Sequence, residues 1–411
     1  MKPFFYRVLS GALLSLLVLA ALPAGAKNWE EDEFWHRPVR HFTFEPANPA
    51  RHALGQTVIG QDQTFNPEKG DTFFDLARYF GLGLNELADA NPGRDEWIPS
   101  YAGKPLAIPT RFVLPCCSYS GIVINIPEMR LYYYPPTRGG PHTVVTFPVG
   151  LGREEWKTPV GKFVVREKTV NPTWVIPDSI RKERIADNGF SEKMIPGGSP
   201  DNPLGKYRMR LSLNLYGIHG TNIPWGVGML VSHGCVRLYP EDIEKLYPMI
   251  PQGTAGEFVY QTVKAGVLGG DVYVEVHKDL YGSHPGPWRE AMAVLERQGL
   301  LDRVDQNLLR QAVMEQTGVA VDVSRASRPG GELDTEDLRV EPARHETAPV
   351  QPDVAPPRDT GDLRSDTAPS VDDDDDFATP EEVDSPQPSQ GAQQSNHADL
   401  SHSHGASRPG R

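Results

Sequence analysis

The 411-residue sequence contains 54 acidic and 41 basic residues, a formal net charge of −13, with 38% hydrophobic and 23% charged residues. This composition is typical of a folded soluble protein of two or three domains. The lack of a clustered basic face excludes a nucleic-acid-binding protein. The charge is uneven: residues 325–411 hold 19 acidic and 8 basic residues, whereas residues 27–324 hold 35 and 31.

The N-terminal segment has the pattern of a cleavable export signal. Lys2 and Arg7 precede the apolar run Leu9–Leu22, and Ala24-Gly25-Ala26 then gives a small-x-small cleavage pattern. We expect residues 1–26 to be a signal peptide that is removed, and the mature protein to reside in the periplasm. The alternative is an uncleaved membrane anchor, but the apolar run is shorter than the ~20 residues that span a bilayer.

A lead-in, residues 27–57, precedes a small unit over residues 58–112. Gly70-Asp71-Thr72 provides a turn and a helix N-cap, and the apolar spacing after it predicts a helix that ends at Gly81. Asn85 is expected to cap a second helix. Pro105-Leu106-Ala107-Ile108-Pro109 is expected to close the unit as a short strand.

This small unit resembles a LysM carbohydrate-binding module. The resemblance rests on Gly70-Asp71-Thr72, Ala90-Asn91-Pro92 and Ile108-Pro109. It implies a β-α-α-β fold and affinity for glycan that contains N-acetylglucosamine. The alternative is a packing domain that binds no sugar.

Short β-rich segments with Gly and Pro between them fill residues 119–262 and predict a mostly β sandwich or barrel. The segments are Ile122–Ile126, Met129–Tyr134, Val144–Val149, Gly161–Val165, Arg210–Ile218 and Gly256–Tyr260. One clear helix, Glu241–Met249, is expected inside this domain, and Gly189–Lys206 is expected to form a flexible flap.

A C-terminal extension follows over residues 263–324. It has a predicted strand, Val272–Val276, and two amphipathic helices, Trp288–Gln298 and Asp305–Gln316, which we expect to pack on the β-rich domain. Residues 325–411 have few apolar side chains to offset chain entropy, so this acidic tail is predicted to be disordered.

Three cysteines are present: Cys116, Cys117 and Cys235. Adjacent cysteines bridge only with strain, so Cys116 and Cys117 are expected to be buried small apolar side chains. Cys235 differs, because its neighbours are polar.

The string Ser232-His233-Gly234-Cys235-Val236-Arg237, with His219 16 positions before the cysteine, carries candidate chemistry. A thiolate is the attacking form of cysteine, and a nearby imidazole can remove the thiol proton. A cation such as Arg237 is expected to lower the thiol pKa further. Backbone N–H groups near Gly234 and Cys235 could stabilise an oxyanion.

Two other interpretations of the string remain open. His219, His233 and Cys235 are residue types that bind zinc, although no second cysteine or carboxylate is patterned nearby. The string could also be ordinary core, but two histidines, a serine and an arginine make it too polar for that.

The string resembles the catalytic signature of the L,D-transpeptidase family, in the branch with a LysM-like N-terminal unit. Further matching strings are Ile218-His219-Gly220-Thr221, Met129-Arg130-Leu131-Tyr132-Tyr133-Tyr134, Thr158-Pro159-Val160-Gly161-Lys162-Phe163, Asn171-Pro172-Thr173-Trp174 and Pro200-Asp201-Asn202-Pro203-Leu204-Gly205. The resemblance covers residues 121–276 and implies a β-sandwich catalytic domain.

The resemblance also implies residue roles. Cys235 would be the nucleophile and His219 its proton acceptor, with His233 a third catalytic residue. The residues expected to shape the site or the oxyanion contacts are Ser232, Gly234, Arg237, Gly220 and Thr221, and those expected to contact substrate are Tyr216 and Trp174. We expect Arg237 either to hold a substrate carboxylate, since its guanidinium suits one bidentately, or to order the site. No metal or cofactor is required.

The implied reaction is transfer of a peptidoglycan stem peptide through a cysteine thioester. D-alanine leaves, and the diaminopimelate acyl group passes to another diaminopimelate or to a lysine of an outer-membrane lipoprotein. Carbapenems would acylate Cys235. The alternatives are a hydrolase with water as the acceptor, and a wall-binding protein without catalysis.

Overall fold

The structure is a computed structural model that describes residues 31–48, 54–68, 70–95, 104–116, 118–137, 140–283 and 286–325. Contacts divide the chain into residues 1–342 and 343–411, and every described residue belongs to the first unit. The predicted signal peptide, almost all of the predicted disordered tail and Cys117 lie outside the described residues. Within the described residues, none of the helices has the length and apolar character needed to span a bilayer.

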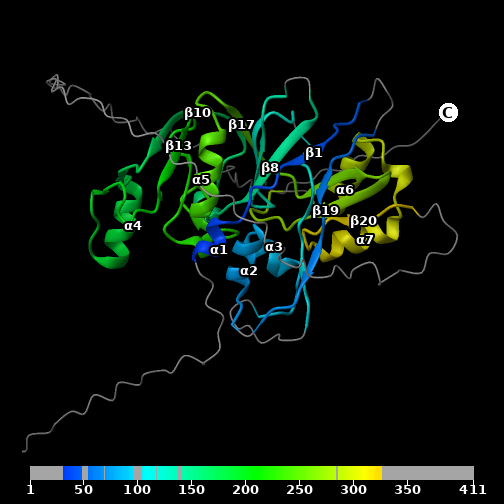
Figure 1. The fold of residues 1–411 in the computed structure, drawn as a ribbon, viewed down its shortest axis with the longest axis horizontal. Coiled ribbons are helices and arrows are strands. Elements are labelled where there is room, and N and C mark those ends of the chain that lie inside the picture. The colour runs from blue at the N-terminus through cyan, green and yellow to red at the C-terminus, as the bar shows by residue number, and fades with distance from the viewer. Residues whose placement is uncertain are drawn as a thin grey trace, which may run out of the picture. The chain divides into compact units, whose positions relative to one another are not determined.

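A nine-stranded mixed sheet forms the β-rich domain (Figure 1). Its strands, in spatial order, are β1 (Phe42–Phe44), β8 (His142–Pro148), β7 (Arg130–Tyr134), β6 (Gly121–Asn125), β17 (Ala255–Val259), β10 (Gly161–Val170), β13 (Tyr207–Leu211), β14 (Gly217–His219) and β16 (Val236–Arg237). The pairs β6–β17 and β14–β16 are parallel and the others antiparallel. The predicted lead-in therefore supplies an edge strand, β1, to this sheet.

The neighbouring strands β6 and β7 are buried on both faces. In β6, Ile122 and Ile124 face the main core, which also contains Ile243 and Leu246 of helix α5 (Pro240–Met249). Val123 points to the opposite face and joins a second core. This division follows from the period-2 alternation of strand side chains. It explains why successive side chains of β6 and β7 are buried on both faces, including Asn125 and Arg130.

The second core belongs largely to the predicted small unit. Its elements are β2 (Val58–Gly60), β3 (Gln63–Phe65), α2 (Phe73–Phe80), α3 (Leu84–Asp89), β4 (Leu106–Ile108) and β5 (Arg111–Val113), and the short helix α1 (Glu31–Trp35) contacts α2 (Figure 1). The order β3-α2-α3-β4 is the strand–helix–helix–strand order expected from the sequence. The Thr72 hydroxyl accepts from the Asp75 N–H (3.2 Å), and Gly81, at φ 72°, ends α2 in the left-handed region.

The predicted cap of α3 is wrong. Asn85 lies inside the helix, and its side chain donates to the Glu128 carbonyl oxygen (3.1 Å). Gly83 occupies the N-cap, and its N–H donates to the Glu86 carboxylate (2.7 Å). This bond from the N-cap backbone to the side chain three residues later is one half of a capping box. It takes the place of a cap by the side chain of the N-cap residue, which glycine lacks.

The C-terminal extension has its own core. Strands β18 (Val263–Leu268), β19 (Asp271–Val276) and β20 (Val321–Asp322) form a sheet, on which α6 (Pro287–Arg297) and α7 (Gln306–Glu315) pack, with a 3₁₀ turn at Leu301–Arg303 between them. The expectation that these helices pack on the β-rich domain is therefore wrong. Their apolar faces are covered by the strands that flank them in sequence.

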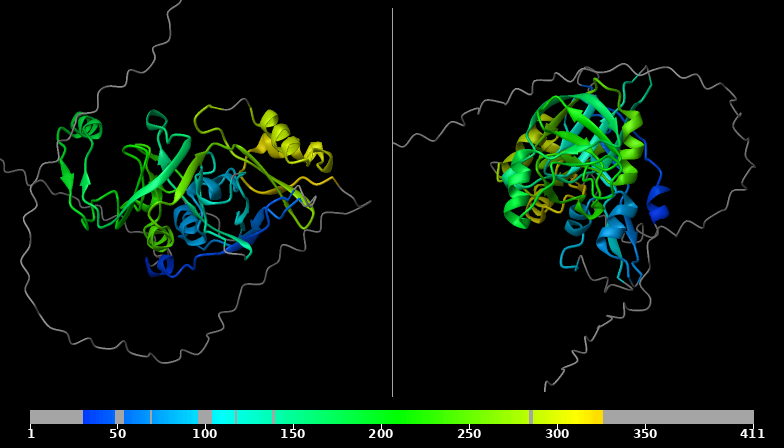
Figure 2. Two further views of the ribbon diagram at one scale, coloured as in Figure 1. Left: turned by 90° about the horizontal axis from the view of Figure 1, so that it is seen from above. Right: turned by 90° about the vertical axis from the view of Figure 1, so that its left-hand side faces the viewer.

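Two further differences lie near the candidate motif. Arg210–Ile218 is not one strand: it includes the turn between β13 and β14, where Leu215 adopts φ 66°. A second helix, α4 (Asp178–Asn188), follows β11 (Trp174–Val175), which pairs with β12 (Met194–Ile195) inside the predicted flap. In Figure 2, left, these green elements stand out from the main sheet.

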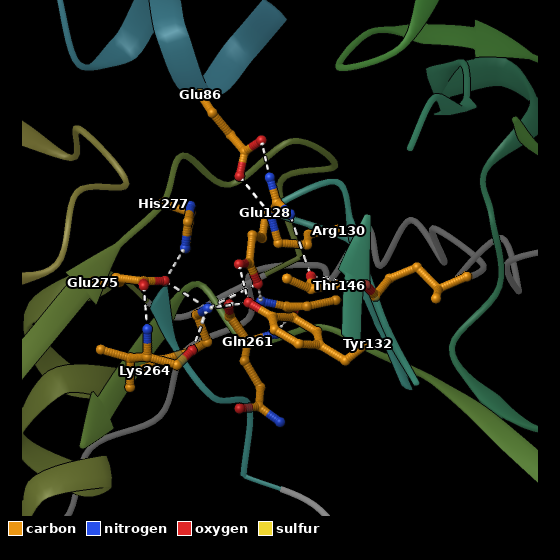
Figure 3. A network of polar contacts seen from close by, with 12 residues as sticks. Glu86, Glu128, Arg130, Tyr132, Thr146, Gln261, Lys264, Glu275 and His277 are labelled. Atoms are coloured by element: carbon orange, nitrogen blue, oxygen red, sulfur yellow. Dashed lines mark hydrogen bonds and ion pairs between the residues drawn. The ribbon is translucent and has the colours of Figure 1, made fainter. Parts of the chain in front are cut away.

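A buried ionic cluster joins the three parts of the chain (Figure 3). Lys264 of the extension lies 2.8 Å from the Glu128 carboxylate and 2.5 Å from that of Glu275, and all three side chains are at most 1% exposed. The Lys264 ammonium also donates to the Val113 carbonyl oxygen (2.6 Å) of the small unit. One cation thus compensates two buried carboxylates at a three-way junction.

We predict that Lys264→Met destabilises the protein by about 3–5 kcal/mol, because it removes the ammonium in direct contact with two buried carboxylates and leaves Glu275 only the contact with His277 (3.1 Å). The measurement is urea unfolding at pH 7. The control is Lys278→Met, which removes an ion pair to Asp89 (2.5 Å) from a lysine that is 59% exposed and is expected to cost about 1 kcal/mol or less. Equal losses in the two variants would contradict the compensating role of Lys264.

Candidate active site

The register of two parallel strands brings His219 and Cys235 together. In the β14–β16 pair, Ile218 lies opposite Val236 and His219 opposite Arg237. Directly opposed residues of neighbouring strands share a face. Cys235 precedes Arg237 by two residues, so the period-2 alternation places its side chain on that face as well. Strands separated by roughly 4.8 Å therefore carry the thiol and the imidazole on one surface.

Hydrogen bonds shape the tight turn that presents Cys235. The Ser232 hydroxyl donates to the Cys235 carbonyl oxygen (2.6 Å) and accepts from the Gly234 N–H (3.0 Å). Gly234 has φ 104°, and a Cβ there would lie 2.5 Å from Cε1 of Tyr216. Only glycine fits this conformation and this close approach. The Gly234 N–H already donates to the Ser232 hydroxyl. Of the two backbone N–H groups expected to stabilise an oxyanion, that of Cys235 is therefore the one left for this role.

A second layer braces the same turn from outside the motif. The Thr158 hydroxyl donates to the Gly234 carbonyl oxygen (3.0 Å) and accepts from the Gly152 N–H (3.0 Å). Tyr281, which lies after β19, donates its phenol hydrogen to the Gly152 carbonyl oxygen (2.7 Å). The C-terminal extension thus helps to hold the loop that carries Cys235. The sequence contained no local signal for this contact, since it joins residues more than a hundred positions apart.

His219 is held in one tautomer. Its Nδ1 lies 2.7 Å from the Gly220 carbonyl oxygen. A carbonyl only accepts, so Nδ1 carries the hydrogen and Nε2 is left as a base. Burial and, to a lesser degree, the charges of Arg237 and Arg208 lower the pKa of His219 to about 3, although the hydrogen bond to Gly220 raises it. The imidazole is therefore neutral at physiological pH.

The thiol of Cys235 is also protonated at rest. Burial raises its pKa, and this effect outweighs the Gly217 N–H and the charges of Arg208 and Arg237, which lower it. The expected lowering effect of Arg237 on the thiol pKa is therefore present, but burial outweighs it. The sulfur lies 3.5 Å from the carbonyl oxygen of Leu215, to which it donates. No hydrogen bond joins the two side chains of Cys235 and His219 among the described residues, so the pair is not pre-ionised.

Cys235 and His219 line a cavity of ≈ 350 Å³. Helix α4 and the segment before it form one wall, and Trp174, expected to contact substrate, lies there with the Arg184 guanidinium 4.9 Å from its ring centre. Of the other expected site residues, Ser232, His233 and Arg237 line the cavity as well.

The remaining expected residues support the cavity from outside its lining. The Tyr216 ring packs against Gly234. Gly220 accepts the hydrogen bond of His219, and the Thr221 hydroxyl accepts from the Ile223 N–H (3.0 Å) in the following turn. These three residues shape the site without facing the open volume.

His233 links the motif to α4. Its Nε2 lies 2.6 Å from a carboxylate oxygen of Glu183, and Arg153 lies 2.7 Å from the other oxygen. Hydrogen bonds from these two partners lower the pKa of Glu183. Trp156 packs against the His233 ring, with 5.3 Å between ring centres. The sequence indicated His233 but none of these partners, which come from distant segments.

The zinc interpretation is not supported by the positions of its ligands. His233 is bonded to Glu183, and His219 uses Nδ1 for Gly220. In the described part of the chain, at least three side chains of metal-ligand type converge only at Glu128, Glu275 and His277, where Lys264 already lies between the two carboxylates. Cys116, expected to be buried, is exposed, so that expectation is wrong.

Comparison with known proteins identifies the family. The sequence pattern of the L,D-transpeptidase catalytic domain, YkuD, matches residues 120–264. Probable L,D-transpeptidase YbiS of Escherichia coli is 37% identical over 280 residues, which are 65% of this chain and 89% of that protein. Probable L,D-transpeptidase ErfK/SrfK of Salmonella typhimurium is 33% identical over 302 residues, 71% and 95% of the two chains. Probable L,D-transpeptidase YcfS of Escherichia coli is 34% identical over 68% of this chain and 81% of that one.

The chain belongs to the L,D-transpeptidase family, and its β-rich domain is the catalytic domain of an enzyme of this class. The expectation from the motif strings is confirmed at this level.

We predict that alkylation of Cys235 by iodoacetamide accelerates steadily from pH 6 to pH 9. The raised thiol pKa means that the thiolate fraction grows about tenfold per pH unit below that pKa. His219, with a pKa of about 3, stays neutral throughout and adds no step. The measurement is the rate of adduct formation by mass spectrometry. A rate that is high and constant between pH 5 and pH 7 would show a thiolate–imidazolium pair and contradict the account.

Proposed function

We propose that Cys235 of this L,D-transpeptidase captures the acyl group of a peptidoglycan stem peptide as a thioester. The observation that carries the proposal is the shared face of β14 and β16, which puts a thiol and a neutral, correctly protonated imidazole beside one cavity. The roles of Cys235 and His219 implied by the family pattern agree with this arrangement.

Acylation begins when substrate excludes water from the cavity. Nε2 of His219 takes the thiol proton, and the sulfur attacks the carbonyl carbon between the third and fourth stem residues. The Cys235 N–H stabilises the oxyanion. The C–N bond then breaks, His219 returns the proton to the leaving amine, and D-alanine departs. Because the thiol must leave the Leu215 carbonyl to reach His219, substrate binding precedes proton transfer.

Deacylation reverses these steps with a new amine. Nε2 of His219 removes a proton from the acceptor, its nitrogen attacks the thioester carbon, and the sulfur leaves and regains the proton. The acceptor is an amine of another diaminopimelate or of a lipoprotein lysine. Helix α4 and Trp174 border the cavity, so this wall contacts one of the two substrates.

Arg237 is proposed to hold a substrate carboxylate. It lines the cavity beside Cys235, burial lowers the pKa of its guanidinium, and its Nε is buried without a hydrogen-bond partner among the described residues. A bound carboxylate would satisfy this group.

The remaining parts of the chain are proposed to serve the same substrate. The LysM-like unit, residues 58–112, is proposed to bind the glycan strand and keep the catalytic domain near its peptides. Export by a cleaved signal, residues 1–26, is proposed to place the enzyme in the periplasm, where peptidoglycan is found.

We expect Cys235→Ala to abolish product formation from purified stem peptides while the protein remains folded. His219→Gln should lower the rate by about 10²–10⁴-fold, the usual contribution of a general base. The assay is mass analysis of muropeptides after incubation with donor and acceptor. Tripeptide without cross-linked product would instead identify water as the acceptor, and unchanged products from Cys235→Ala would contradict the proposed nucleophile.

We expect Arg237→Lys to lower kcat/KM by about tenfold or more, because an ammonium cannot make the bidentate contact of a guanidinium. The thermal midpoint should change little, since Arg237 has no ion-pair partner among the described residues that the change would break. The measurement is steady-state turnover of the stem peptide. Turnover equal to that of the wild type would remove Arg237 from substrate binding.

A further inference from the structure

Two arginines flank His219 across three adjacent strands. Arg208 of β13 lies directly opposite His219 of β14, and His219 lies directly opposite Arg237 of β16. Opposed residues share a face of the sheet, so the three side chains form a row with the base in the middle. The two outer strands are separated by two strand spacings, roughly 10 Å.

Neither flanking guanidinium has an acidic partner within the described ranges, in contrast to the arginines nearby. Arg210, two residues along β13, pairs with Glu167 at 2.9 Å. Arg153, on the other side of the motif, pairs with Glu183 at 2.7 Å. Arg208 is half-buried, and no carboxylate lies within 4 Å of it or of Arg237 among the residues that the structure places. This face thus carries two guanidiniums without a carboxylate in direct contact, although the Arg208 charge also acts on Glu167.

Arg208 leans towards the nucleophile. A Cβ built on Gly217 would lie 3.6 Å from Nε and 3.9 Å from Cγ of Arg208, so the arginine side chain passes over the glycine. The Gly217 N–H is directed at the sulfur of Cys235. Gly217 carries no side chain beside Arg208, and the Arg208 charge acts on the Cys235 thiol, although Arg208 does not itself line the cavity.

Two unpaired guanidiniums beside a buried base cost stability through their mutual repulsion and their desolvation. An anionic ligand that enters the site relieves both. A carboxylate matches the planar fork of a guanidinium with two parallel hydrogen bonds.

We propose that Arg208 binds a carboxylate of the acyl donor, separate from the carboxylate held by Arg237, and so makes the site selective for donors with two carboxylates. This proposal rests on the proposed function, since it names the donor class of the same site. The carboxylate is either the C-terminal one on the leaving residue or the side-chain one on the residue that acylates Cys235. Arg208 is thus a residue that determines specificity.

The first test needs no peptide. Iodoacetate and iodoacetamide alkylate the same thiolate and differ in one carboxylate, so the ratio of their rates at Cys235 reports attraction of a carboxylate and cancels any change in thiol pKa. We expect the ratio to fall by about 10- to 100-fold in Arg208→Met, the effect of losing a hydrogen bond to a charged group, and to be partly restored in Arg208→Lys. Arg210→Met is the matched control, because it removes a cation of the same strand face that is already paired.

An unchanged ratio in folded Arg208→Met would overturn the proposal. An equal fall of the ratio in Arg210→Met would also overturn it, because the effect would then come from the overall positive potential of this face and not from a contact with Arg208. Thermal midpoints establish folding. If Arg208→Met does not fold, the ratio of the two alkylation rates is measured in Arg208→Lys alone. A ratio equal to that of the wild type then overturns the proposed bidentate contact between the guanidinium and a carboxylate.

The second test identifies the carboxylate. Stem tetrapeptides are compared with derivatives that carry an amide at the C-terminus or at the side chain of the third residue. The wild type is expected to turn over both amides more slowly than the tetrapeptide with two free carboxylates. Arg208→Met is expected to lose this preference for one of the two amides only, and that amide identifies the carboxylate that Arg208 binds. An equal loss of kcat/KM for every donor in Arg208→Met would overturn the proposal. No turnover of any donor by the wild type, together with a high iodoacetate ratio, would instead count against the proposed reaction while leaving the carboxylate site intact.

Discussion

The site depends on the pairing register of β14 with β16. These two short strands are parallel, so the chain must leave the sheet after His219 and return before Val236, and the return is the tight turn that carries Cys235. A slip of one residue would turn Cys235 to the core face, because successive strand residues alternate. Ser232, Gly234 and Thr158 fix the turn by hydrogen bonds, and Ile218 and Val236 anchor the strands in the apolar core. The geometry of the proposed active site is thus a consequence of core packing on the opposite face of these strands.

Burial sets the resting charge state of the pair. It disfavours charge on both groups, raising the thiol pKa and lowering that of the imidazole. The flanking arginines act in the same direction on His219, since they repel a proton from it. In the proposed mechanism, the thiol and the base are both neutral in the empty site, and the nearby positive charges favour binding of an anionic donor. The binding energy of that donor would then support the proton transfer.

The sequence allowed some features to be predicted because their signals are local. The helices α2, α6 and α7 follow from apolar spacing and from caps such as Thr72 and Gly81, and the motif around Cys235 identified the family. The single strand predicted over Arg210–Ile218 is wrong. Leu211, Leu213 and Leu215 alternate as strand residues do, but Leu215 lies in the left-handed region and turns the chain. Helix α4 was missed because it has no buried face.

Other features could not be read from a single sequence because they join distant segments. The contact of Glu183 with His233, the support of the turn by Tyr281 and the junction at Lys264 each need the folded chain. The overall direction of the thiol pKa was not accessible from the sequence for a related reason. Arg237 was visible as a neighbour, but the extent of burial, which outweighs it, is a property of the fold.

The central claim is that His219 is a neutral base with its hydrogen on Nδ1. Nitrogen-15 NMR of histidine-labelled protein measures this directly, since the chemical shifts distinguish a protonated from a bare ring nitrogen. The account predicts that Nδ1 of His219 is protonated and Nε2 bare at every pH from 5 to 8, consistent with a pKa of about 3. A ring with both nitrogens protonated at pH 6, or with the hydrogen on Nε2, would contradict it.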